Sequence, residues 1–337
     1  MESDLEVTVV DVSDEAAFAE FHRVLTVADS TGRAYSTPTG LDEMRVGFRP
    51  DNTEWRASAV VASRRGQVVG ALNLELPLRD NTHLLEVHVG VLPEHRRRGV
   101  GRALFDHALQ TARATGRRSI YAQVVEPVGS SSPGAGFAAA CGLSRELVEL
   151  HQVLDLPLDD AVLASLRAAA DHAERDGYRI ATWQDRCPEE YAEGYCRLLS
   201  VFLEHVPIGG LDLEPEVWDV ARLRATEARR LAQRRTAYRA VALDASGGVV
   251  GGTDLLAPAD PSPLVYQGAT LVLTEHRGHR LGVALKLANL RALQQRQSER
   301  RTVHTYNAPD NRPMIAVNEQ LGFRSVEQSS DWQLTVS

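Results

Sequence analysis

The sequence has little of what marks secreted, membrane-spanning or nucleic-acid-binding proteins. Its 337 residues include only three cysteines, Cys141, Cys187 and Cys196, whose number and spacing suit neither a disulfide framework nor a metal site. It contains no run of about 18 apolar residues and no basic, apolar leader after its acidic start. Asp and Glu outnumber Lys and Arg by 45 to 37, which argues against a general nucleic-acid binder. These absences predict a soluble, cytoplasmic protein with no metal and no membrane or nucleic-acid partner.

What is present is ordinary globular material, 43% hydrophobic and 24% charged. The most informative stretch is 85–104. Apolar and polar side chains alternate along 85–91, which predicts a strand, and Pro93 ends it because proline has no N–H for a ladder. A helical pattern begins at Val100. The loop 96–101 (RRRGVG) lies between them, and free N–H groups at a helix N-terminus favour phosphate.

The second half of the chain repeats the first. Three motifs recur 181 positions further on, at residues 70 and 251, 96 and 277, and 101 and 282. A repeat this long predicts two copies of one domain, which agrees with a length of about two domains of ~150 residues. The expected division is a domain over 1–156, a connecting helix over 157–177 and a second domain over 178–337.

Local patterns place elements within these copies. A hairpin is expected from strands at 55–62 and 67–76 with a turn at 64–66. Residues 30–50 are polar, and we interpret them as irregular. In the second copy, helices are expected at 191–206 and 216–233.

These motifs, in this order, resemble the GCN5-related N-acetyltransferase (GNAT) family. The pyrophosphate loop of that family reads Arg/Gln-x-x-Gly-x-Gly/Ala. Residues 96–101 fit it at every position, and residues 277–282 fit except that Arg280 replaces the first glycine. Residues 307–323, which end in Leu-Gly-Phe, are similar to a later family segment. The resemblance implies a mixed α/β fold of two tandem GNAT domains, each a mostly antiparallel twisted sheet flanked by helices, as in the mycothiol synthase group.

The same resemblance implies acetyl-CoA as the cofactor, with its phosphates on the loops and its pantetheine arm beside the preceding strands. In the first copy it assigns this role to Val89, Val91, Arg96, Arg97, Arg98, Gly99, Val100, Gly101 and Arg102. In the second copy it assigns it to Thr270, Val272, Arg277, Gly278, His279, Arg280, Leu281, Gly282, Val283, Asn307 and Asn311.

Acetyl transfer to an amine requires a group that removes a proton from nitrogen, because a lysine-like amine has a pKa near roughly 10. Glu86 is the best candidate in the first copy, and His88, on the same face of the strand, is the second. In the second copy Gln267 stands 181 positions after Glu86 and cannot act as a base. Tyr266 and His304 are the titratable groups nearby.

The tyrosine that the family often uses as an acid is missing from both copies, where Ala138 and Asn318 occupy its position. Which copy is catalytic is left open at this stage. Residue chemistry favours the first copy, and the resemblance to the mycothiol synthase group favours the second.

The expected activity is acetyl-CoA-dependent N-acetylation of a small-molecule amine by direct attack in a ternary complex, in a monomer or homodimer. One alternative is a non-catalytic acyl-CoA-binding or regulatory protein, because neither copy has a full set of acid and base. Another is acetylation of a peptide or protein amine. A tRNA-dependent aminoacyl transferase is disfavoured by the two retained pyrophosphate loops.

Overall fold

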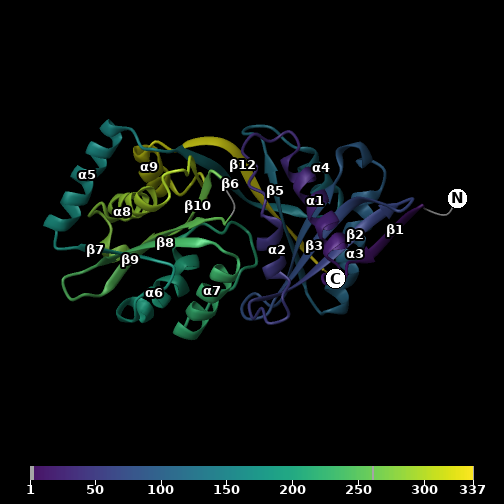
Figure 1. Cartoon of the computed structure of the whole chain (residues 1–337), viewed down its shortest axis with the longest axis horizontal. Coiled ribbons are helices and arrows are strands. Elements are labelled where there is room, and N and C mark those ends of the chain that lie inside the picture. Colours follow the sequence, from purple (N-terminus) through teal and green to yellow (C-terminus); the bar gives the residue numbers. More distant parts are fainter. Residues whose placement is uncertain (1–3, 260–261, 337) are drawn as a thin grey trace. The chain divides into compact units, whose positions relative to one another are not determined.

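A computed structural model describes residues 4–259 and 262–336, which form two compact units (Figure 1). Among these residues, unit 1 consists of 4–148, 209–214 and 329–336, and unit 2 of 149–208 and 215–328. The units therefore differ from the two contiguous domains predicted with a boundary at residue 156. The final strand of each sequence copy changes unit part-way along its length.

Unit 1 begins with a strand, two helices and a three-stranded meander. Its elements are β1 (Leu5–Val9), α1 (Glu15–Ser30), α2 (Leu41–Gly47), β2 (Trp55–Arg64), β3 (Gln67–Pro77), β4 (Leu84–Val91), the 3₁₀ turn η1 (Pro93–His95), α3 (Val100–Ala114), β5 (Ser119–Glu126), α4 (Pro133–Ala140), the first part of β6 (Ser144–Asp155) and the last part of β12 (Arg324–Thr335).

Unit 2 follows a similar order. Its elements are the last part of β6, α5 (Asp160–Arg175), β7 (Arg179–Gln184), α6 (Glu189–Ser200), the 3₁₀ turn η2 (Phe202–His205), α7 (Val220–Ala232), β8 (Thr236–Leu243), β9 (Val249–Ala257), β10 (Leu264–Val272), the 3₁₀ turn η3 (Thr274–His276), α8 (Leu281–Arg296), β11 (Thr302–Asn307), α9 (Arg312–Leu321) and the first part of β12.

Each unit contains a mixed sheet in which one central pair of strands is parallel. The strand order in unit 1 is β1-β2-β3-β4-β5-β12, with β4 and β5 parallel and the preceding pairs antiparallel. In unit 2 it is β6-β11-β10-β9-β8-β7, with β10 and β11 parallel. The predicted fold class is therefore confirmed. The strand next to β5 comes from the end of the second sequence copy, and the strand next to β11 from the end of the first.

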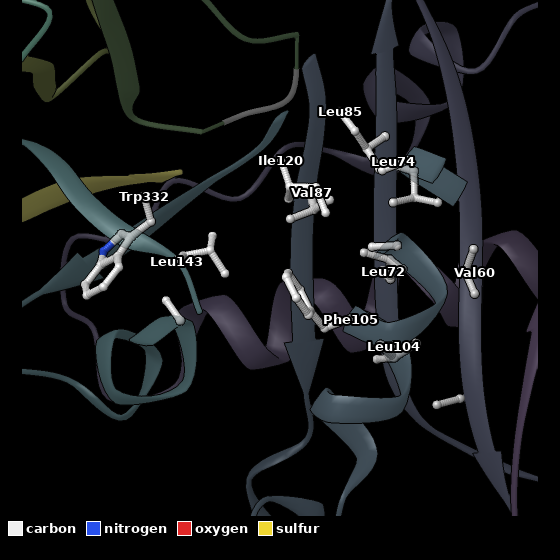
Figure 2. Packing of buried hydrophobic residues seen from close by; sticks show 14 of the residues in the cluster. Val60, Leu72, Leu74, Leu85, Val87, Leu104, Phe105, Ile120, Leu143 and Trp332 are labelled. Carbon is white, nitrogen blue, oxygen red and sulfur yellow. The ribbon is translucent and has the colours of Figure 1, made fainter. Parts of the chain in front are cut away.

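In unit 1 the two faces of the sheet carry different side chains. One face packs against α3 through a buried cluster shown in Figure 2, to which β3, β4, β5 and β12 contribute Leu72, Leu85, Ile120 and Trp332. The opposite face of β2 and β3 is covered by α1, whose Asp14 side chain caps its first turn. Because side chains alternate along a strand, the residues between those of the α3 face point to the opposite face. That face carries most of the polar groups described below.

Several local predictions are confirmed and others corrected. The hairpin turn adopts two left-handed residues, Arg65 (φ 52°) and Gly66 (φ 77°), which suits the twist of a tight hairpin. The stretch 30–50 was expected to be irregular but contains α2. The helix expected at 216–233 begins only at Val220, where the Asp219 side chain accepts a hydrogen bond from the Arg222 N–H.

The helix expected as a connector over 157–177 is α5, and it belongs to the body of unit 2. Its Leu166 is fully buried in the unit 2 core, and Ala173 is almost fully buried beside residues of α8. The helix expected at 191–206 is divided into α6 and the turn η2. Within the described ranges, no helix is long and apolar enough to cross a membrane.

Candidate functional site

In unit 1 the parallel strands β4 and β5 separate part-way along their length. Their register ends one pair beyond Glu86↔Tyr121, although both strands run on for four more residues. Beyond that pair, the described strands leave the backbone groups on the β5-facing edge of β4 without a strand partner, as at a sheet edge. We call this opening the fork of unit 1 and the pair Glu86↔Tyr121 its base. Val89 and Val91 lie on the open arm, where an extended ligand can add main-chain hydrogen bonds.

The loop after β4 exposes the N-terminus of α3. Gly99 precedes the helix in the left-handed region (φ 83°), and no side chain caps the first turn. The first intrahelical bond runs from the Ala103 N–H to the Gly99 carbonyl, so the N–H groups of residues 100–102 have no intrahelical acceptor. Such a helix end binds anions. A Cβ on Gly101 would lie 3.2 Å from the Phe137 ring, so Gly101 permits close packing of α4.

The loop arginines have different environments. Arg96 is turned away from the loop: its Nε donates to the Val91 carbonyl (3.0 Å) and its Nη2 to the Ala28 carbonyl (3.2 Å). Arg102 pairs with Asp106 at 2.8 Å on the helix surface. Arg97 adopts a left-handed conformation (φ 60°) in the loop. The Val100 side chain is buried in the core, so it offers only its backbone N–H to a ligand.

Unit 2 has an equivalent fork between β10 and β11. The parallel register ends at Tyr266↔His304, which forms its base, and both strands continue. Unlike β4, β10 carries an irregularity between Gln267 and Thr270, where the register with β9 shifts by one residue. Val272, on the open arm, packs against the cluster that includes α8.

This bulge overturns the equivalence of Gln267 with Glu86. Glu86 pairs with Glu75, and its counterpart Leu256, 181 positions after Glu75, pairs with Tyr266. Tyr266 therefore occupies the position of Glu86. The Gln267 side chain is 7% exposed, and its Nε2 donates to the Thr253 hydroxyl (2.9 Å) and the Asp254 carbonyl (2.7 Å). Gln267 thus braces the bulge.

The loop before α8 has the same backbone conformation as the loop before α3, with its glycine at a different position. Gly278 (φ 90°) stands where unit 1 has Arg97, and Arg280 (φ 58°) stands where unit 1 has Gly99. No side chain caps α8, and its first intrahelical bond again leaves the N–H groups of 281–283 unpaired within the helix. Both left-handed positions are kept, although a residue other than glycine costs roughly 1–2 kcal/mol there.

Other predicted ligands of unit 2 already have contacts within the unit. Some are charged or polar: the Arg277 Nε donates to the Val272 carbonyl (3.1 Å), and His279 Nδ1 lies 2.5 Å from Asp176 Oδ2. Others support the fold, because the Asn311 side chain caps α9 by accepting from the Met314 N–H, and the Thr270 hydroxyl lies 2.7 Å from that of Thr253. Asn307 is half-buried and lies within reach of the Thr305 hydroxyl (3.5 Å), whereas the side chains of Leu281 and Val283 are buried. A Cβ on Gly282 would make ordinary contact with Val317 at 3.6 Å.

Comparison with known proteins identifies the fold of both units. The model of the acetyltransferase (GNAT) family matches residues 24–132. A tandem GNAT protein from the clavulanic acid biosynthesis pathway, solved without AcCoA, is 30% identical, with 99% of each chain covered and a TM-score of 0.79. The chain belongs to the GNAT family. It has the tandem layout of that relative, as the sequence predicted.

More distant structures share the fold alone. A GCN5-related N-acetyltransferase from Sphaerobacter thermophilus is 12% identical over 100% of this chain and 97% of its own, with a TM-score of 0.64. A putative acetyltransferase from Pyrococcus horikoshii is 13% identical over 100% and 91%, with a TM-score of 0.55. No curated protein shows significant sequence similarity to the chain.

In this tandem GNAT protein the base of each fork continues into a third strand. In unit 1 the Tyr121 hydroxyl donates to Asp331 Oδ1 of β12 (2.8 Å). In unit 2 His304 Nδ1 lies 2.9 Å from His151 Nε2 of β6. We call Glu86–Tyr121–Asp331 the base row of unit 1 and Tyr266–His304–His151 the base row of unit 2.

The two base rows occupy equivalent positions. The Val336 N–H donates to the Arg118 carbonyl in unit 1, and the Leu156 N–H donates to the Arg301 carbonyl in unit 2. Tyr121 lies three residues after Arg118, and His304 lies three residues after Arg301. Asp331 lies five residues before Val336, and His151 lies five residues before Leu156. Neither Tyr121 nor Asp331 was predicted as a site residue. Only the pairing of β5 with a strand from the far end of the chain brings them together.

The two histidines of the base row of unit 2 are buried, whereas Tyr266 is half-buried. His151 is fully buried, its Nδ1 lies 3.1 Å from Glu327 Oε2, and the Tyr306 ring stacks on it with centroids 4.5 Å apart. Burial, together with the neighbouring His151, lowers the pKa of His304 to about 4. In unit 1, Glu86 is half-buried like Tyr266 and Asp331 is buried like His151, so the rows differ in burial at the middle position, where Tyr121 is half-buried and His304 is buried.

At the positions of the family tyrosine the two GNAT units also differ. Ala138 packs into the apolar core of unit 1. Asn318 is fully buried in unit 2, where its Oδ1 accepts from Lys286 Nζ (2.7 Å) and its Nδ2 donates to Gln152 (2.8 Å). Burial lowers the pKa of Lys286 to about 7. Among the described residues, no group of three or more His, Cys, Asp and Glu could hold a metal ion.

Proposed function

We propose that the chain is an acetyl-CoA-dependent N-acetyltransferase acting on a small-molecule amine, with its catalytic centre at the fork of unit 1. The observation that supports the proposal is that one short segment of the chain carries all three parts of the candidate site. Glu86 at the base of the fork, the open arm of β4 and the uncapped start of α3 follow one another within 17 residues. An extended cofactor with phosphates at one end and an acyl group at the other could lie along this segment, with its phosphates at α3 and its acyl group near Glu86.

The residues of unit 1 fit acetyl-CoA. The N–H groups of residues 100–102 and the charges of Arg97 and Arg98 would hold its phosphates. The backbone of Val89 and Val91 would hold the pantetheine arm along the open edge of β4. The cofactor would supply an acetyl thioester at the base of the fork. Arg96 would act indirectly, because it holds the junction of β4 and the loop.

Glu86 is the proton acceptor of this proposal. Its carboxylate is half-buried on the face of the sheet opposite the α3 core, so it can take a proton from an ammonium group that arrives on that face. His88 lies two residues along the same strand, exposed, at the entrance to the fork. Glu75, in register with Glu86 on β3, adds negative charge that favours a cationic acceptor.

Unit 2 is proposed to bind the same cofactor less well and to contribute no proton acceptor at its fork. Its loop offers equivalent N–H groups, but Asp176 brings a carboxylate against His279 beside them. Its base row carries Tyr266 at the position of Glu86. These contacts favour unit 1 over the second copy as the catalytic unit.

The proposal is tested by following thiol release from acetyl-CoA with a panel of small amines, amino sugars, polyamines and short peptides, and by identifying products by mass spectrometry. Release that depends on a small amine, with an N-acetylated product, supports it. Saturable binding of acetyl-CoA in calorimetry with no transfer to any acceptor would instead indicate an acyl-CoA-binding protein. Transfer to peptides alone would mean that the acceptor is a peptide or protein amine and not a small-molecule amine.

A further inference from the structure

A tyrosine, Tyr121, lies in register with Glu86 at the base of the fork of unit 1. Tyr121 and Glu86 are in register on parallel strands, and their neighbours Ile120 and Leu85 both face the α3 core. Both side chains therefore point to the same, opposite face. The Tyr121 side chain is half-buried, so its hydroxyl is held without being sealed from the fork.

Asp331 holds this hydroxyl. Trp332 faces the α3 core, which turns Asp331 to the face of Glu86 and Tyr121. The carboxyl is 4% exposed, and its Oδ1 accepts hydrogen bonds from the Tyr121 hydroxyl at 2.8 Å and from Gln123 Nε2 at 3.2 Å. Because Tyr121 has only one hydroxyl proton and directs it to Asp331, any further hydrogen bond of its oxygen is one that it accepts.

The reaction proposed above gives such a group a task. An ammonium nitrogen loses two protons when it becomes an amide: one before it attacks the acetyl carbon, and one after the N–C bond has formed. The C–S bond then breaks, and the leaving thiolate takes up one proton. Glu86 accounts for the first proton, and a relay at the same place would carry the second proton from nitrogen to the thiolate. The position of the family tyrosine, Ala138, cannot provide it.

We propose that Tyr121 is a second catalytic residue of unit 1 and that Asp331 is its positioning residue, an inference that rests on the function proposed above. Tyr121 accepts the second proton from nitrogen at its oxygen while its own hydroxyl proton passes to Asp331. The return of that proton through Tyr121 to the thiolate restores both residues. No proton is left over except the one on Glu86, which solvent removes.

The surroundings suit this exchange. Removal from water raises the pKa of Asp331, although the hydrogen bonds from Tyr121 and Gln123 oppose the shift, so the carboxylate is a stronger base than an exposed one. On the strands nearest to this pair, the titratable groups on this face of unit 1 are Glu86 and His88 on β4 and Glu75 on β3. Farther away, Glu6 on β1 points to the same face, and α1, which covers part of it, carries His22. A proton stored on Asp331 also lowers the negative charge that Glu75 and Glu86 create there.

Tyr121→Phe and Asp331→Asn test the proposal in the full chain, with acetyl-CoA and the best amine found in the panel. Tyr121→Phe is expected to lower kcat by about 10- to 100-fold, with KM for acetyl-CoA within about twofold. In Asp331→Asn the amide still accepts from Tyr121 but takes up no proton. We expect kcat to keep rising above the pH at which the wild type levels off.

Ser330→Ala is the matched control, because Ser330 lies beside Asp331 on β12 and its side chain points to the opposite face of the sheet. Its hydroxyl donates to the Val124 carbonyl and to Glu126. The change therefore removes hydrogen bonds of β12 without altering the contact between Tyr121 and Asp331. Unchanged kcat and pH profile are expected. Calorimetry with acetyl-CoA shows that each variant retains its folded cofactor site.

Three outcomes are decisive. A fall in kcat with an altered pH profile in Tyr121→Phe and Asp331→Asn, but not in Ser330→Ala, supports the inference. Wild-type kcat and pH profile in Tyr121→Phe, together with loss of activity in Glu86→Gln, would overturn it while leaving the proposed function intact. A wild type that transfers acetyl to none of the amines overturns the function, and this inference with it.

Discussion

The forks of units 1 and 2 share a backbone and differ in the side chains at their base. Both open just after a paired position on parallel strands, and both lead to an uncapped helix. At the base, unit 1 has Glu86–Tyr121–Asp331 and unit 2 has Tyr266–His304–His151. In the function proposed above, phosphate binding would depend on the main-chain geometry that both forks share, whereas proton transfer would depend on side chains that differ between them.

The loops before α3 and α8 also share a backbone conformation and differ in their residues. Left-handed residues stand at the same two positions, but unit 1 has its glycine at the second and unit 2 at the first. Glycine is the usual residue at positive φ because it has no Cβ. Here each loop keeps one glycine and one arginine at these positions. The conformation of the loop, rather than a particular glycine, is what the two copies have in common.

The largest expected effect is that of Glu86→Gln, which removes the carboxylate from the base row of unit 1. We expect kcat/KM at neutral pH to fall by about 100- to 1,000-fold, because a glutamine accepts no proton. The loss should shrink as pH rises, since more of the amine is then already neutral. Thiol release measured across pH checks this, with Tyr266→Phe in unit 2 as the control. A loss confined to Tyr266→Phe would make unit 2 the catalytic unit.

Gly101→Val is expected to abolish the cofactor site of unit 1 alone. A Cβ at Gly101 already lies 3.2 Å from Phe137, so a valine must displace α4 or the start of α3. Calorimetry with acetyl-CoA should show affinity in unit 1 reduced at least about tenfold, or ~1.4 kcal/mol. Gly282→Val, where the nearest atom is 3.6 Å away on Val317, is the matched change in unit 2. Unchanged stoichiometry and affinity in Gly101→Val would place the unit 1 site elsewhere.

Lys286 makes the stability of unit 2 depend on pH. Burial lowers its folded-state pKa to about 7, against 10.5 in the unfolded chain. Between these values the unfolded state binds a proton that the folded state has lost, so the free energy of unfolding rises with pH. We expect a rise on the order of 3 kcal/mol from pH 7 to 10, measured by denaturant titration, and little slope from this source below pH 7. Lys286→Met should remove this pH dependence of the free energy of unfolding. If the dependence persists in that variant, another titratable group causes it.

The smallest effect is expected from Asp176→Asn in unit 2. Asp176 lies against His279 in the loop that would hold phosphates, so its charge opposes an anion there. Removing the charge should raise the affinity of unit 2 for acetyl-CoA by about two- to fivefold at low salt, and less at high salt. Calorimetry of Gly101→Val with and without Asp176→Asn isolates this site. Weaker binding would mean that Asp176 supports the loop by orienting His279.

The site was only partly predictable from the sequence. The face on which Glu86 lies could be predicted, because alternation along one strand reveals which residues share a face. The match of Glu86 to Gln267 was wrong because a bulge of one residue reverses the faces beyond it. Gly268 lies at that bulge, and a glycine inside a strand is the signal that could have revealed it. Asp331 was missed because strand pairing links residues 210 positions apart.

By itself the sequence determined the two strand–loop–helix motifs, their repetition at a spacing of 181 and the GNAT fold that they build. These features depend on neighbours in the chain: alternation, a proline that ends a strand, and residues that tolerate positive φ. The tertiary structure alone decided which strand completes each sheet, and so which side chains stand at the base of each fork. Strand partners are chosen by long-range packing, and so the two loops before α3 and α8 could be predicted from the sequence, whereas the contact between Tyr121 and Asp331 could not.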